Sequence, residues 1–85
     1  MSYNGHYTGT WTDGGGTQHS MWINVSGTSV AGNVAGTGFN TVISPLPNGV
    51  SWTANSLNYN GQFNSTSPLS ANGTSSDGGT WSVAV

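Results

Sequence analysis

The feature that most constrains the fold is a two-residue alternation of apolar and polar side chains, interrupted by turns rich in glycine. In HYTGTWT (residues 6–12), Tyr7, Gly9 and Trp11 alternate with threonines. Turn signals recur about every 8 to 12 residues, and no stretch shows the period of an amphipathic helix. The pattern predicts an all-β chain. We expect one domain, residues 1–85, folded as a single small antiparallel meander or barrel of six to eight short strands.

The alternation also predicts strand positions and one register. Val25 pairs with Val30 across a two-residue turn at Gly27 and Thr28, which gathers the apolar side chains of both strands on one side. Asn60-Gly61 is the strongest short hairpin signal in the chain. PLSANGTS, residues 68–75, is a weaker strand candidate. The other predicted strands are residues 6–12, 18–25, 29–35, 38–44, 50–56, 57–66 and 80–85.

Composition narrows the class of protein further. Glycine, serine, threonine and asparagine make up 48 of the 85 residues, and only two residues, both aspartates, carry a formal charge. Disordered chains are usually charged and poor in aromatic residues, whereas this chain has four tryptophans, three tyrosines and two phenylalanines. Without lysine or arginine, nucleic acid and anionic membranes are not expected partners. Because the chain has no cysteine, disulfides and zinc-thiolate sites are excluded. We also expect no cofactor.

Neither a signal peptide nor a membrane-spanning helix is expected from the sequence. The N-terminal stretch MSYNGHYTG has neither a basic nor an apolar region, so no signal peptide is predicted. No apolar run approaches the roughly 20 residues that a membrane-spanning helix needs.

The two aspartates pose the main question about a site. Asp13 and Asp77 each precede glycine, which is typical of turns in which the carboxylate accepts a backbone hydrogen bond. Were the two carboxylates close together, they could instead hold Ca²⁺ or act as an acid/base pair. An even number of strands places both loops at the same end of a meander, so the strand count decides whether the two carboxylates can lie close together. His6 and His19 are predicted to lie on different faces, and no metal site is expected.

The stretch YTGTWTDGGGT, residues 7–17, resembles the opening of the avidin family and, more loosely, of lipocalin-like barrels. GTSVAGNVAG, residues 27–36, is similar to the turn and strand that follow there. The resemblance covers about the first third of the chain and implies an up-and-down antiparallel barrel. It places Asp13 and Thr17 where that family has polar residues contacting biotin. However, Val34 stands where the family has a tyrosine and Gly15 where it has a larger residue, so biotin binding is not predicted.

The tryptophans provide the remaining site candidates. Trp11 and Trp81 are in phase with the apolar face and are predicted to be core. Trp22 is predicted to point outward, next to Asn24, whereas the pattern leaves Trp52 ambiguous. An outward tryptophan among asparagines is either a platform for stacking a sugar or an oligomer contact. The candidate binding or interface residues are Trp22, Asn24, Trp52, Asp13 and Thr17.

Two functions remain open. The first is a non-catalytic structural or assembly protein of a virion or cell surface, such as a decoration, fibre or surface subunit that forms homo-oligomers. A nearly uncharged surface favours association, and a small domain without disulfides gains core by burial against neighbours. The alternative is a small carbohydrate- or ligand-binding β-barrel module, with a neutral glycan as partner. No catalytic residues are expected, because neither a nucleophile elbow nor a phosphate-binding loop is present.

Overall fold

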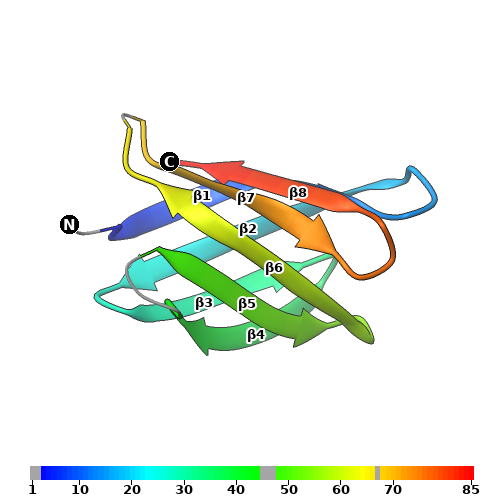
Figure 1. The fold of residues 1–85 in the computed structure, drawn as a ribbon, viewed down its shortest axis with the longest axis horizontal. Helices are drawn as coiled ribbons and strands as arrows, with labels where there is room; N and C mark the ends of the chain where they lie inside the picture. Colours follow the sequence, from blue (N-terminus) through cyan, green and yellow to red (C-terminus); the bar gives the residue numbers. More distant parts are fainter. Residues whose placement is uncertain (1–2, 45–47, 67) are drawn as a thin grey trace.

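The computed structural model describes residues 3–44, 48–66 and 68–85, and within them it contains eight β-strands and no α-helix (Figure 1). The strands are β1 (Gly5–Thr12), β2 (Gln18–Ser26), β3 (Ser29–Val34), β4 (Thr37–Val42), β5 (Gly49–Ala54), β6 (Leu57–Asn64), β7 (Ser70–Ser75) and β8 (Thr80–Ala84). The prediction of an all-β antiparallel barrel is confirmed, with eight strands. No helix in the described ranges is long and apolar enough to cross a membrane.

The strands form one sheet in the order β4-β3-β2-β1-β8-β7-β6-β5. Each strand pairs antiparallel with its neighbours in the chain, except that β4 and β5 form no ladder. The first and last strands instead pair with each other over five residues, from Thr8 opposite Ala84 to Thr12 opposite Thr80. This is the up-and-down arrangement that the resemblance to avidin implies.

The two edge strands, β4 and β5, leave the barrel nearly closed along one seam. A single isolated bridge joins Ile43 to Val50. Beyond it, side chains replace the ladder: Thr41 Oγ1 donates to the Ser51 carbonyl at 2.7 Å, and Thr37 Oγ1 donates to Asn55 Oδ1 at 2.6 Å. Side-chain hydrogen bonds therefore bring together two edges whose backbone groups would otherwise be exposed.

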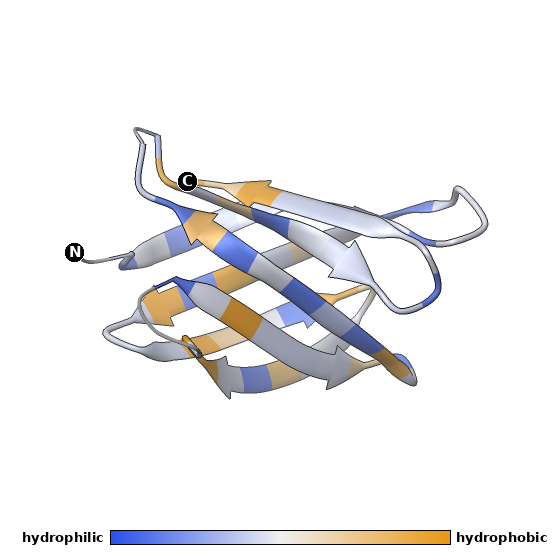
Figure 2. Cartoon of the chain, in the orientation of Figure 1, coloured by the Kyte–Doolittle hydropathy of each residue, from blue (hydrophilic) through white to orange (hydrophobic). Residues whose placement is uncertain are grey.

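The register predicted for β2 and β3 is confirmed: Val25 lies opposite Val30 across the Gly27–Thr28 turn. The seven predicted strands match the observed ones to within two residues at each end. Hydropathy alternates along several strands, as Figure 2 shows, because successive side chains point to opposite faces.

One prediction about the second half of the chain is wrong. Asn60 and Gly61 lie inside β6, and the hairpin turn lies at Asn55 and Ser56, which adopt positive φ angles of 55° and 61°. Gly61 is required by packing, because a Cβ there would lie 2.2 Å from the Asn72 carbonyl oxygen and 2.5 Å from Cζ2 of Trp81. The weaker strand candidate at residues 68–75 is confirmed: it contains β7, which pairs with β6 and with β8.

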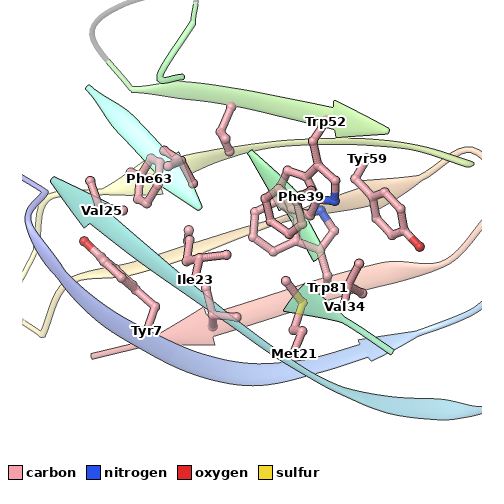
Figure 3. Close-up of a cluster of buried hydrophobic side chains, with 14 of the residues drawn as sticks. Tyr7, Met21, Ile23, Val25, Val34, Phe39, Trp52, Tyr59, Phe63 and Trp81 are labelled. Carbon is pink, nitrogen blue, oxygen red and sulfur yellow. The ribbon is translucent and has the colours of Figure 1, made fainter. Parts of the chain in front are cut away.

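Aromatic rings fill the inside of the barrel (Figure 3). Phe39 and Trp52 stack across the seam at 4.2 Å between ring centroids, and Trp52 stacks on Tyr59 at 5.2 Å. Trp11 and Trp81 are buried as predicted, and Trp52, which the sequence left ambiguous, is core at 6% exposure. The fully buried side chains are Trp81, Tyr7, Tyr59, Phe63, Ile23, Val30, Val34, Val50 and Val83.

Inward-facing glycines allow the strands to coil tightly around these rings. A Cβ on Gly73 would lie 1.9 Å from the Asn60 carbonyl oxygen, and a Cβ on Gly9 would lie 1.9 Å from that of Ser82. Atoms cannot approach so closely, so only glycine fits where the backbones meet.

Candidate functional site

The two aspartate loops lie at the same end of the barrel. The β1–β2 loop and the β7–β8 turn are adjacent in Figure 1, because β1 and β8 pair and the strand number is even. The Asp77 carboxylate joins them: its Oδ2 accepts a hydrogen bond from the backbone N–H of Gly14 at 2.9 Å. The question raised by the sequence is therefore answered: the two acids share one end.

Asp13 organises its own loop. Its Oδ1 accepts hydrogen bonds from the backbone N–H groups of Gly15 at 2.9 Å and Thr17 at 3.0 Å. Its Oδ2 accepts one from His19 Nε2 at 2.9 Å, and the imidazole stacks on Trp11 with ring centroids 4.7 Å apart. These bonds favour the ionised carboxylate, so the pKa of Asp13 is lowered, first by His19 and then by Thr17.

Asp77 is held by a second set of donors. Its Oδ1 accepts hydrogen bonds from the Ser75 hydroxyl and, at 3.0 Å, from the Gly79 N–H. The pKa of Asp77 is also lowered, with Ser75 as the largest cause and Gly14 next. Ser75 is buried and in turn accepts a hydrogen bond from Trp11 Nε1 at 3.0 Å. Ser75 is not among the residues predicted from the sequence, where its inward phase on β7 is the one signal that could have indicated it.

The aspartates thus act as turn residues, as predicted, and Asp77 additionally ties two loops together. All four carboxylate oxygens accept hydrogen bonds from the chain itself. Across the ranges that the structure describes, no group of three or more histidine, cysteine or acidic residues is placed to hold a metal ion.

Trp22 lies on the outer wall of β2, as predicted, with 39% of its surface exposed. The His6 imidazole lies beside it, with ring centroids 5.8 Å apart, and His6 Nδ1 donates a hydrogen bond to Asn24 Oδ1. Trp22 and Asn24 therefore form one surface with His6. His6 and His19 do not converge, because His19 lies at the end of the barrel that carries the two aspartates, which we call the acidic end.

The outer wall around Trp22 carries no Asp, Glu, Lys or Arg in the described strands, since the two aspartates lie in loops. Thr17 lies in the Asp13 loop, where its backbone N–H is already bonded to the carboxylate. Of the sequence candidates, only Trp22 and Asn24 come together on this wall, whereas Trp52 is inside the barrel.

A second feature of the outer wall is a depression of about 460 Å³ over β1, β7 and β8. Gly73 and Trp81 contribute to its lining. This depression could not be predicted, because residues 68–75 are only a weak strand candidate in the sequence and their pairing with β8 is not encoded locally. The surrounding polar side chains are Thr10, Thr12, Asn72, Thr74, Thr80 and Ser82.

Comparisons with protein-family models, with curated proteins and with solved structures found no match to this chain. Its function has to be inferred from its own residues.

Proposed function

We propose that this protein is a non-catalytic structural or assembly protein that self-associates through the uncharged outer wall of its barrel. The observation that carries the proposal is Trp22, a large indole exposed on a wall of neutral side chains. Covering the exposed part of an indole contributes on the order of 1 kcal/mol through apolar burial. A wall without charges adds little repulsion between copies.

The arrangement around Trp22 suits a contact surface. The His6–Asn24 hydrogen bond and the adjacent imidazole limit the freedom of the indole before any partner arrives. Side chains already held in place lose less entropy on binding. In the register, Thr8 and Asn33 flank Trp22 on the neighbouring strands, so its surroundings are polar but neutral.

The size of the core removes one argument for self-association. The sequence suggested that so small a domain needs neighbours to complete its core, but 18 buried apolar residues already form one cluster within a single chain. We therefore propose association between folded copies. A role as a decoration, fibre or surface subunit of a virion or cell surface fits a folded unit with a neutral wall.

The test is the mass in solution of a Trp22→Ser variant, measured by light scattering, with far-UV circular dichroism as a check on folding. We expect wild type to exceed the mass of one chain and the variant to lose mass while keeping its β-sheet spectrum. Val42→Ser is the matched control, because Val42 is also exposed, at 51%, but lies on β4. Unchanged mass in Trp22→Ser would reject Trp22 as the contact.

Carbohydrate binding is the second candidate, and the immediate neighbours of Trp22 favour it. An exposed indole next to an amide and an imidazole can stack on the apolar face of a sugar and hydrogen-bond its hydroxyls. Loss of glycan binding in Trp22→Ser, at unchanged mass, would favour this candidate over self-association.

A further inference from the structure

We propose that the depression over β1, β7 and β8 is a binding site for a neutral oligosaccharide. This inference rests on the carbohydrate-binding candidate and assigns it to a place other than the indole of Trp22. The depression is built from three adjacent strands with β8 in the middle.

The lining side chains form two rows across these strands. In register, one row is Thr10, Ser82 and Asn72, and the other is Thr12, Thr80 and Thr74. Adjacent strands are about 4.8 Å apart, so each row places polar groups at short, repeated intervals. A hydroxyl both donates and accepts hydrogen bonds, as sugar hydroxyls do, and the threonine methyl groups can contact the C–H groups of a sugar ring.

These hydroxyls are not used by the protein. Those of Thr10, Thr12, Thr74, Thr80 and Ser82 make no hydrogen bond to any other described residue. Of the outward threonines elsewhere on the strands, Thr53 donates to Asn58 Oδ1 at 3.1 Å, whereas the hydroxyl of Thr8 has no partner among the described residues. Asn72 is the one lining side chain with a partner, since its Oδ1 accepts a hydrogen bond from Asn64 Nδ2 at 3.2 Å.

One glycine contributes to the lining of the depression. Gly73 lines the depression and lies where the backbones of β6 and β7 approach too closely for any side chain. The volume of the depression, about 460 Å³, falls in the range of small-ligand sites, about 300–1,000 Å³.

Charge and position select the class of ligand. The chain has no lysine or arginine to neutralise an anion, and Asp13 directly follows Thr12. Anionic sugars are therefore disfavoured and neutral ones favoured. Trp22 pairs with Thr8, two residues from Thr10, so an extended ligand leaving the depression across β1 would approach the indole.

The experiment is calorimetric titration of the full chain with neutral hexasaccharides, namely cellohexaose, maltohexaose, xylohexaose and mannohexaose, and with a chondroitin sulfate hexasaccharide as the anionic comparison. The test variant is Thr12→Val/Thr80→Val, which removes two hydroxyls and keeps the shape. Thr53→Val is the matched control on β5, outside the depression.

We expect at least one neutral hexasaccharide to bind, and the anionic hexasaccharide not to bind. The double variant should weaken binding of the neutral sugar about tenfold or more, whereas Thr53→Val should leave it unchanged. Unweakened binding in the double variant would overturn the inference. If Trp22→Ser alone abolished binding, the carbohydrate candidate would stand and the depression would be rejected. If no hexasaccharide bound, the carbohydrate candidate and the site in the depression would both be rejected. Self-association would still be judged by the mass in solution.

Discussion

Two parts of the barrel wall use the same residue type in opposite ways. At the β4–β5 seam, the hydroxyls of Thr37 and Thr41 hydrogen-bond to the opposite edge and substitute for a missing ladder. Over β1, β7 and β8 the ladders are complete, and hydroxyls such as that of Thr80 have no partner among the described residues. The difference shows that the threonines of this barrel are not equivalent: those at the seam bond within the protein, whereas those over β1, β7 and β8 have no partner among the described residues.

The largest effect is expected from a side chain at Gly73, where the backbones of β6 and β7 meet beside the depression. Gly73→Ala places a Cβ 1.9 Å from the Asn60 carbonyl oxygen, so strands must separate. We expect a loss of about 3 kcal/mol in the free energy of unfolding, at the upper end for overpacking. Gly38→Ala is the control, because its nearest neighbour would be 3.8 Å away. Denaturant unfolding measures both, and equal stability of the two variants would contradict the packing argument.

The seam and the depression can also be compared by one chemical change. Thr41→Val removes the donor to the Ser51 carbonyl and should lower the free energy of unfolding by about 1 kcal/mol. Thr80→Val removes a hydroxyl without a protein partner and should change stability by less than about 0.5 kcal/mol. A Thr80→Val loss as large as that of Thr41→Val, in the same denaturant series, would show that the depression hydroxyls are structural.

The two aspartates extend the comparison from threonine hydroxyls to carboxylates in which every oxygen accepts a hydrogen bond. Asp77→Asn replaces the oxygen that accepts from Gly14, and an amide nitrogen cannot accept that bond. Asp13→Asn keeps an oxygen for Gly15 and Thr17. We therefore expect the larger fall in melting temperature for Asp77→Asn, measured by thermal denaturation at neutral pH. The reverse order would mean that the link between loops contributes less than the Asp13–His19 pair.

Lowering the pH should weaken the hydrogen bonds to the two aspartates and lower the melting temperature, by less than the substitutions do. The pKa values of both aspartates are lowered in the folded protein, by hydrogen bonds from His19 and from Ser75 as the largest causes. Their contribution to stability is therefore present above the unfolded pKa, about 3.9, and is lost as the pH falls through the lower folded values. We expect the melting temperature to fall below about pH 4, and less steeply in Asp77→Asn. A variant with the same slope as wild type would rule out Asp77 as a source of this dependence.

Local pattern predicted the fold well because alternation and two-residue turns are short-range properties. The β2–β3 register followed from residues 21–34 alone. Asn60-Gly61 misled because the packing of Trp81 against Gly61, twenty residues away, outweighed the turn preference of the pair. The link from Asp77 to Gly14 and the depression depend on pairing between the two ends of the chain, and no local pattern encodes that pairing.

The central claim is that the protein meets its own copies through a neutral outer wall, and sedimentation equilibrium tests it most directly. The mass would be measured from micromolar to millimolar protein, at low and at high salt. The account predicts a mass above that of one chain, rising with concentration and unaffected by salt, because screening does not weaken contacts between uncharged surfaces. A mass of one chain at every concentration, or an assembly that salt dissolves, would contradict it.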